Sequence, residues 1–261
     1  MARNTITPAL VLSLQPLGES NSSVRLLTKS DGIVYATLYG GAKSRLRSLV
    51  SPWNSGTAYI STPPRSRNGK ISDFDVQNYH LSFRESLFKA WAAALAAEVA
   101  IKTKCAGSPE RCWPLVSGFL DGLELCADDS QASAGLLRFL WRFLDLLGVQ
   151  PDAAACGRCG RPFLTGKNPG NPLSWEEAGA AYSPAENSFL CAGCLSEQSG
   201  FFLNADAVRY LAAVSALPPA QARLFGLAQE SAGQLKRLTF HLVEAACGMR
   251  LNALETGTGI L

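Results

Sequence analysis

Long hydrophobic runs are absent from this sequence of 261 residues. Its longest apolar stretch, residues 90–101, is interrupted by Glu98 and falls well short of the roughly 20 residues that span a bilayer. Residues 1–20 contain a single Arg and an apolar run of six residues, and they lack the small-x-small cleavage site of a signal peptide. We therefore expect a cytoplasmic protein that makes no membrane contact.

Catalytic motifs are also scarce. The two histidines, His80 and His241, lie far apart in sequence and in no recognisable pattern, so we assign them no role. The chain has no Gly-x-x-x-x-Gly-Lys-Ser/Thr loop for nucleotide phosphates and no His-x-Glu of the zinc deaminases. Its content of 47% hydrophobic and 17% charged residues is nevertheless typical of folded domains. We expect a folded protein that is not an enzyme.

The charged residues are unevenly distributed along the chain. Residues 1–80 contain nine Lys or Arg and four acidic residues, whereas residues 81–261 contain fifteen basic and seventeen acidic residues. A basic surplus confined to one part of a chain favours nucleic-acid binding, although an ordinary solvated surface has the same composition. The charge distribution therefore points to the first 80 residues without deciding between these two interpretations.

The first 80 residues predict β structure. Five short segments are apolar or alternating, and turn signals separate them. Ser30-Asp31-Gly32 and Asn68-Gly69 each fit a tight hairpin turn, because Asn and Gly tolerate positive φ. Five short strands predict a small barrel, and the OB-fold is the five-stranded barrel that holds single-stranded nucleic acid. The expected strands are residues 9–14, 23–29, 32–39, 56–61 and 71–79.

After residue 80 the apolar period lengthens from two toward 3.6, which predicts helices. We expect an α+β, multidomain protein with an OB-fold followed by a helical domain that carries a metal-binding insert. The expected helices are residues 83–102, 110–126, 131–147, 205–217, 219–230 and 233–254. The expected domains are the OB-fold, residues 1–80; the first part of the helical domain, 81–151; the insert, 152–200; and the second helical part, 201–261.

Cysteine is the residue with the clearest chemical pattern. Two Cys-x-x-Cys pairs, Cys156 with Cys159 and Cys191 with Cys194, are separated by 31 residues. Each tight turn can present two thiolates to one tetrahedral ion, and metal binding would fold a segment that is poor in apolar side chains. Disulfides are disfavoured in a cytosolic chain, and a redox pair would need a βαβ context.

The same four cysteines predict a structural rather than a catalytic metal. Four thiolates close the tetrahedron, whereas catalytic zinc keeps an open position. We predict one structural Zn²⁺ per chain. The remaining cysteines are expected to behave as small apolar core residues; they are Cys105, Cys112, Cys126 and Cys247.

Basic residues recur in the predicted barrel. Lys43, Arg45 and Arg47 alternate with other residues directly after a strand, so an extended segment would line them along a phosphate backbone. A second basic cluster, formed by Arg65, Arg67 and Lys70, is expected at the tip of a hairpin. Ordinary solvated loops remain the alternative for each cluster. The candidate DNA contacts are Arg25, Lys29, Lys43, Arg45, Arg47, Arg65, Arg67 and Lys70.

The order of these motifs is similar to that of the RecO family of recombination mediators. The resemblance rests on Ala-Leu-Val-Leu-Ser-Leu at residues 9–14, on Gly-Gly-Ala-Lys-Ser-Arg-Leu-Arg at residues 40–47, and on the cysteine array after Gly148 and Pro151. It extends from about residue 8 to residue 195 and is weakest after residue 200. Ser51 and Trp53 depart from the Gln and Phe that are usual in the family.

The resemblance implies an N-terminal OB-fold, a helical domain with a zinc site, and no ATPase activity. It also implies binding to single- and double-stranded DNA, annealing of complementary strands, and cooperation with RecR in loading RecA onto strands coated by single-strand-binding protein. The acidic C-terminal tail of that protein is an expected partner of the helical domain, and RecF and RecA are expected as indirect partners, at the nucleoid. The alternatives are an RNA-binding or translation-associated OB-fold with a zinc ribbon, a zinc hydrolase or transferase, and a protein scaffold.

Overall fold

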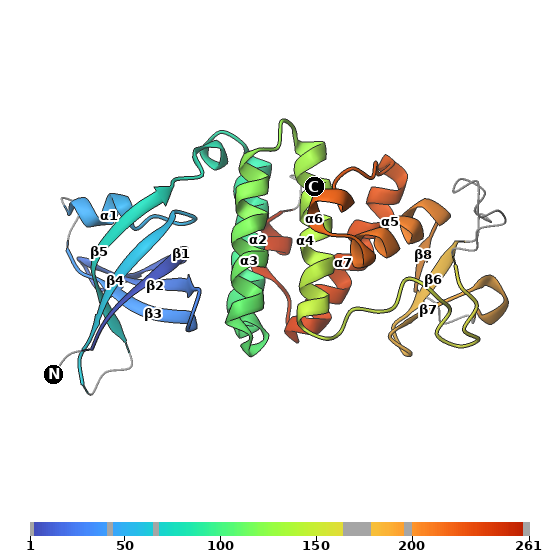
Figure 1. Ribbon diagram of the computed structural model, residues 1–261, viewed down its shortest axis with the longest axis horizontal. Helices are drawn as coiled ribbons and strands as arrows, with labels where there is room; N and C mark the ends of the chain where they lie inside the picture. Colours follow the sequence, from blue (N-terminus) through green and yellow to red (C-terminus); the bar gives the residue numbers. More distant parts are fainter. Residues whose placement is uncertain (1–2, 41–43, 65–67, 164–178, 196–199, 258–261) are drawn as a thin grey trace. The chain divides into compact units, whose positions relative to one another are not determined.

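The computed structural model describes residues 3–40, 44–64, 68–163, 179–195 and 200–257 (Figure 1). The chain divides into two compact units, one formed by residues 1–132 with 247–261 and the other by residues 133–246. The two units are described separately below. Lys43, Arg65 and Arg67, three of the predicted DNA contacts, lie outside the described residues.

The first unit begins with a closed five-stranded barrel in the order β1-β2-β3-β5-β4. Neighbouring strands are antiparallel except β3 and β5, which pair in parallel. The long strand β1 pairs with both β2 and β4, and its register shifts between Val11 and Ser13. The elements are β1 (Arg3–Leu17), β2 (Asn21–Thr28), β3 (Gly32–Leu38), α1 (Arg45–Leu49), β4 (Ser55–Thr62) and β5 (Gly69–Asn78). The predicted OB-fold is confirmed.

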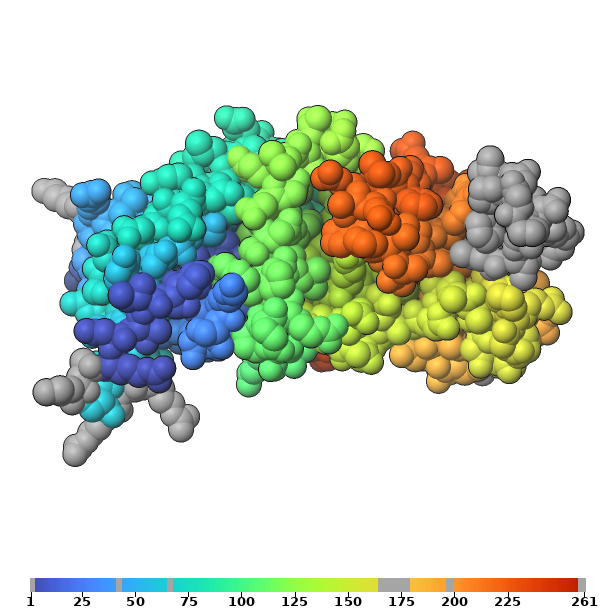
Figure 2. Space-filling model, in the orientation of Figure 1, coloured from blue at the N-terminus to red at the C-terminus, as the bar shows by residue number. Residues whose placement is uncertain are grey.

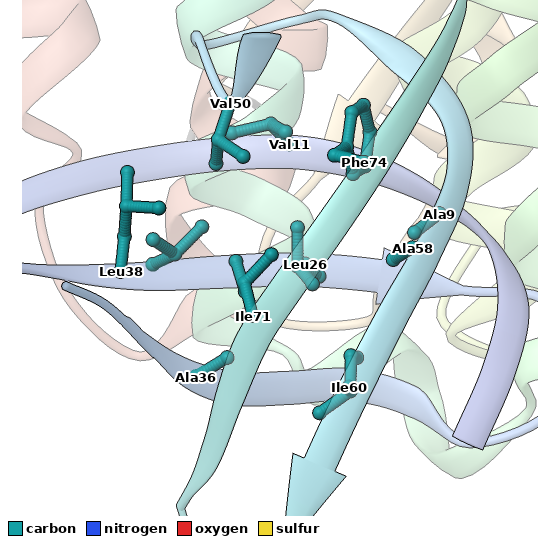
Figure 3. Packing of buried hydrophobic residues seen from close by; sticks show 11 residues of the cluster. Ala9, Val11, Leu26, Ala36, Leu38, Val50, Ala58, Ile60, Ile71 and Phe74 are labelled. Carbon is teal, nitrogen blue, oxygen red and sulfur yellow. The ribbon is translucent and has the colours of Figure 1, made fainter. Parts of the chain in front are cut away.

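Alternation along the strands separates the inside of the barrel from its outside. Residues two apart on a strand point to the same face, so one set from each strand meets in the interior. Figure 3 shows how these side chains lie together among the strands. The buried cluster contains Ala9, Val11, Val24, Leu26, Ala36, Leu38, Val50, Ala58, Ile60, Ile71 and Phe74. The intervening residues point outward. Some of them, such as Leu10, Leu12 and Leu27, are buried, since α2 and α3 contact the barrel strands, and the others are available to solvent or to a ligand.

The two predicted hairpin turns have different outcomes. Residues 29–31 connect β2 to β3 in a tight turn, and Gly32 adopts a positive φ of +67°. The prediction at Asn68-Gly69 is wrong, because Gly69 already belongs to β5 and its φ is not positive. A Cβ atom at Gly69 would lie 2.3 Å from Cγ2 of Ile60, so this glycine permits close packing rather than a turn.

Helices pack beside the barrel within the same unit. Helix α2 is rich in alanine and almost wholly buried, and it contacts α3 and β1. Helix α3 contacts β2 and β3. The C-terminal helix α8 joins α2, since Trp91 donates a hydrogen bond to the Ala253 carbonyl at 2.6 Å and Glu98 accepts the N–H groups of Asn252 and Ala253. These elements are η1 (Leu81–Arg84), α2 (Leu87–Lys102), η2 (Lys104–Gly107), α3 (Pro109–Glu124) and α8 (Asn252–Thr256).

His80 connects the end of the barrel to these helices. Its side chain is 1% exposed. Because a carbonyl only accepts, Nδ1 donates to the Trp53 carbonyl at 2.7 Å, while Nε2 lies 3.0 Å from the Asp121 carboxylate of α3. The imidazole also stacks on Phe83 with ring centroids 5.1 Å apart. A histidine without a sequence motif thus has a structural position between strand β5 and helix α3.

The second unit is built around helix α4, which runs from the end of the first unit. Arg142 donates to the carbonyls of Val214 and Leu217, and Trp141 donates to Ser215. The remaining elements are α4 (Asp129–Leu146), β6 (Ala180–Ser183), β7 (Ser188–Leu190), η3 (Ala192–Cys194), β8 (Phe201–Leu203), α5 (Ala205–Ala216), α6 (Pro219–Ala222) and α7 (Gln229–Cys247). Strands β7, β6 and β8 form a small sheet in that order.

Two helical predictions for this part need correction. The helix expected over residues 219–230 is only one turn long, since α6 ends at Ala222. The helix expected over residues 233–254 is divided into α7 and α8, with a break at Gly248, which has a φ of +66°. A glycine in the left-handed region ends a helix, because few other residues adopt that conformation without strain. No helix in the described ranges is both long and apolar enough to cross a membrane.

Candidate functional site

The four predicted metal ligands meet in the second unit. The sulfur atoms of Cys156, Cys159, Cys191 and Cys194 all lie within 4.8 Å of one another. Those of Cys159 and Cys191 are 3.7 Å apart. A tetrahedral ion with sulfur ligands at about 2.3 Å holds those sulfurs about 3.8 Å apart. The cluster could therefore hold a metal ion, and its donor set and spacing are compatible with zinc.

The first cysteine pair lies in a tight turn between α4 and β6. The Cys156 N–H donates to the Arg161 carbonyl at 2.8 Å, and the Gly160 N–H donates back to the Cys156 carbonyl at 2.8 Å. Gly160 supports this turn with a φ of +71°. At Gly157 a Cβ atom would lie 2.6 Å from Cβ of Ser188, so only glycine allows the turn to approach strand β7. The two glycines fix the turn that presents this pair.

The second pair follows strand β7 directly. The Cys194 N–H donates to the Cys191 carbonyl at 2.8 Å, and the Cys191 N–H points at the Cys156 sulfur at 3.4 Å. Arg158 joins the two turns, since it donates to the Cys194 carbonyl at 2.9 Å and pairs with Glu186. That position makes Arg158 a brace of the metal site rather than a free cation.

The pKa values of the thiols in this cluster differ from one another. Burial would raise the pKa of Cys156, but backbone hydrogen bonds from Cys159, Cys191 and Arg158 outweigh it and lower the pKa to about 6. Hydrogen bonds with the thiols of Cys159 and Cys191 raise the pKa of Cys194 to about 12. Backbone N–H groups thus already stabilise one thiolate, as a metal site requires.

The predicted basic contacts that the structure describes occupy different parts of the barrel surface. Arg25 lies on the outside of β2, where it donates to Gln15 at 3.2 Å and to Ser13 at 3.5 Å. Lys29 is exposed just after β2. Lys70 is exposed on β5, beside its parallel partner Thr37 of β3. These three cations lie on the β1-β2-β3 side of the barrel and its border with β5.

The expectation of an extended segment at Arg45 and Arg47 is wrong. Both residues belong to the one-turn helix α1, where side chains two apart point to nearly opposite sides. The apolar residue between them, Leu46, packs against the barrel core and turns the two exposed arginines away from each other. The two arginines therefore cannot contact one phosphate row in the way the alternation suggested.

Two tyrosines belong to the same outer surface, and the sequence analysis missed them. Tyr35 and Tyr39 are 43% and 51% exposed. The Arg25 guanidinium lies 5.9 Å from the ring centroid of Tyr35, and the Lys70 ammonium lies 5.5 Å from that of Tyr39. The period of two along β3 could have revealed both, because Ala36 and Leu38 alternate with them and point inward. We call Arg25, Tyr35, Tyr39 and Lys70 the aromatic face.

Further along β5, the surface of the barrel is acidic. Asp73 and Asp75 are exposed on β5, on either side of the inward-pointing Phe74. Tyr59 of β4 donates to Asp75 at 2.9 Å, and this hydrogen bond, together with the nearby negative charge, raises the pKa of the Tyr59 hydroxyl. Helix α1, which bears the exposed Arg45 and Arg47, also contacts β5, so the acidic pair lies between cations on two parts of the barrel surface. A polyanion is attracted to those cations and repelled by Asp73 and Asp75.

The second unit also contains a pocket of about 1050 Å³. Residues 150–154 form one wall and helix α5 another, and Figure 2 shows these segments, in yellow-green and orange, side by side. Ala213, Leu217 and Phe225 give it an apolar lining, and Arg209 lies at its border in an ion pair with Asp206. Asp152 and Asp206 also line the pocket, so its walls are suited to an apolar side chain and offer no unpaired positive charge among the described residues.

The barrel, the helices and the four cysteines define an OB-fold protein with a helical domain that carries a four-cysteine cluster. Residues 1–78 match the family described as Recombination protein O N terminal, and residues 84–255 match Recombination protein O C terminal. The chain belongs to the RecO family.

Named relatives agree with this assignment. The chain is similar to the DNA repair protein RecO of Syntrophobacter fumaroxidans, with 28% identity over 160 residues, which are 61% of this chain and 63% of the relative. It is 31% identical over 156 residues to that of Gluconacetobacter diazotrophicus, covering 59% and 61% of the two chains. It is 25% identical over 190 residues to that of Bacillus pumilus, covering 72% and 67%. The matches thus span between 61% and 67% of the relatives' lengths.

Proposed function

We propose that this protein is a DNA repair and recombination mediator that binds single- and double-stranded DNA and anneals complementary strands. The observation that carries the proposal is the contrast between basic and acidic parts of the barrel surface. Arg25, Lys29 and Lys70 place positive charge around the β1-β2-β3 side, and Asp73 and Asp75 place negative charge on the β4-β5 side. The family to which the chain belongs supports the same role.

Annealing follows from charge neutralisation. Cations that hold phosphates lower the repulsion between two complementary strands and leave the base edges free to pair. Arg45 and Arg47 of α1 contribute as separate contacts that extend the basic surface, together with the predicted contacts Lys43, Arg65 and Arg67. Because most of this attraction is independent of sequence, the protein should anneal strands of any complementary sequence.

The metal has a structural role in this proposal. The four cysteine sulfurs would fill the coordination shell of one Zn²⁺ and would leave no position for a substrate or an activated water. The residues of the cluster hold the turn of Cys156–Arg161 against strand β7 and stabilise the small sheet. The protein accordingly acts by binding and not as an enzyme.

Partners of the mediator follow from the family resemblance. They are RecR, single-strand-binding protein, and, less directly, RecF and RecA at the nucleoid. The pocket beside α5 offers apolar walls to the terminal Phe of the acidic tail of single-strand-binding protein, and Arg209 would contact the acidic part of the tail only by exchanging its ion pair with Asp206.

A strand-annealing assay tests the proposal. Complementary DNA strands coated with single-strand-binding protein should anneal when this protein is added, and RecR should be retained by the immobilised protein. An RNA-binding OB-fold would instead anneal RNA strands in preference to DNA and would not retain RecR. A zinc enzyme would lose turnover on metal removal while its fold persisted, which is the opposite of the behaviour expected here.

A further inference from the structure

The aromatic face combines features that phosphate binding alone does not require. Tyr35 lies on β3 and Tyr39 directly follows that strand, and the two residues are 43% and 51% exposed. Thr37 lies between them on the same side. A lysine or arginine surface would suffice to neutralise phosphates, so two exposed rings need a different explanation.

Each ring is accompanied by a cation. The guanidinium of Arg25 and the ammonium of Lys70 lie within 6 Å of the centroids of Tyr35 and Tyr39, at 5.9 and 5.5 Å. Gln15 and Ser13 on β1 accept hydrogen bonds from Arg25 and hold it beside its ring. A base that stacked on either tyrosine would bring its phosphate close to a positive charge that is already in place.

The distance between the two rings favours contact with single-stranded over duplex nucleic acid. Three residues lie between Tyr35 and Tyr39, and the four steps from one to the other correspond to about 13 Å of extended backbone. Neighbouring bases in a duplex are stacked about 3.4 Å apart along each strand, and their faces are covered by one another. Two rings this far apart therefore contact bases only when the strand is single, extended and unstacked.

We infer that Tyr35 and Tyr39 bind the unpaired bases of single-stranded DNA by stacking on them. The inference rests on the DNA-binding function proposed above and deepens it. A single strand is held through both bases and phosphates, whereas a duplex is held through phosphates alone. Pairing withdraws bases from the rings, so the annealed product is bound more weakly than the strands that formed it.

The test compares ring removal with ring retention in the full-length protein. The double variant Y35L/Y39L replaces both rings by apolar side chains of lower stacking ability, and Y35F/Y39F keeps the rings. Y79L serves as the matched control, because Tyr79 is also 43% exposed and the described part of the chain places no cation over its ring. Circular dichroism of each variant verifies the fold.

Three probes separate base contacts from phosphate contacts. They are a single-stranded DNA oligonucleotide, a strand of the same length made of abasic deoxyribose phosphates, and the corresponding duplex. The wild-type protein should bind the base-containing strand about tenfold more tightly per stacked base than the abasic strand, a value in the lower part of the range for base–aromatic stacking. Y35L/Y39L should lose this preference while keeping its affinity for the duplex, and Y35F/Y39F and Y79L should retain the preference.

The possible results are distinguishable. If Y35L/Y39L still prefers the base-containing strand, the stacking inference is wrong and the DNA-binding function stands. If the wild-type protein binds neither the single strand nor the duplex at low salt, the proposed function itself fails. A wild-type preference for RNA over DNA of the same sequence would overturn the assignment of the face to DNA.

Discussion

The four-cysteine site and the aromatic face are assembled in different ways. Each cysteine pair lies within four consecutive residues, so a local turn brings its two ligands together. The aromatic face takes one residue from β2, two from the region of β3 and one from β5, and these meet only because the barrel closes. A site made of local turns can be recognised from spacing, whereas a site made of neighbouring strands depends on register.

The two sites also differ in what their loss should do. The four-cysteine site joins two turns that lie against strand β7, whereas the aromatic face lies on the surface of a barrel whose core contains neither of its rings. Damage to the first should therefore appear as unfolding, and damage to the second as lost binding with the fold intact.

Cys156→Ala should have the largest effect. The free energy of zinc binding is about 10 kcal/mol or more in structural zinc peptides, and much of it is lost when one of the four ligands is removed. We expect loss of zinc and fast hydrogen exchange across β6–β8, with unchanged exchange in the barrel. Hydrogen exchange by mass spectrometry, with zinc content measured in parallel, checks this. Cys247→Ala, outside the cluster, is the control, and equal zinc loss in both variants would contradict the assignment.

Acidification should weaken the metal site next. Cys194, with its pKa raised to about 12, carries a proton at neutral pH that zinc must displace. Cys156, with its pKa lowered to about 6, becomes protonated only as the pH falls through 6, and the stability contributed by its thiolate is lost there. Zinc affinity should therefore fall about tenfold per pH unit for each competing proton, and more steeply below pH 6. Competition with a chromophoric chelator measures it, and a flat profile would refute it.

His80→Ala tests the tertiary anchoring of the barrel. The change leaves the Trp53 carbonyl without its donor and opens a cavity beside Phe83, at a cost of about 2–4 kcal/mol. Urea unfolding should show the loss in the first unit. His241→Ala is the matched control, since that ring is only half-buried, against Phe201 and Tyr182. Equal urea unfolding midpoints for the two variants would show that His80 does not stabilise the first unit.

Arg25→Ala with Lys70→Ala should have the smallest effect on the fold. Each lost phosphate contact should reduce the slope of log affinity against log salt by about 0.7 to 0.9. DNA affinity should fall while the unfolding midpoint stays unchanged. Arg223→Ala, an exposed arginine of the second unit, controls for net charge. A salt slope that equals the wild-type value would show that the basic surface lies elsewhere.

Prediction from sequence succeeded where the signal was local. The strands were found because alternation and turn residues report a half-buried strand directly, and the cysteine cluster was found by its spacing. Failures came where distant residues decide local structure. Arg45 and Arg47 were expected in an extended segment, but contact between Leu46 and the barrel core makes that segment a helix. Gly69 was interpreted as a turn residue, but the Ile60 side chain requires a glycine there.

The sequence by itself determined the two candidate ligand pairs and the positions of the barrel strands along the chain, because both depend on patterns within short segments. The order of the strands in the barrel depends on the distant pairings of β1 with β4 and of β3 with β5. Only the tertiary structure decided which side chains share a surface. Arg25 meets Tyr35 through the pairing of β2 with β3, and Lys70 reaches Tyr39 through the parallel pairing of β3 with β5. Such pairings depend on the register in which the whole barrel buries its core, and a one-residue shift would turn the tyrosines inward.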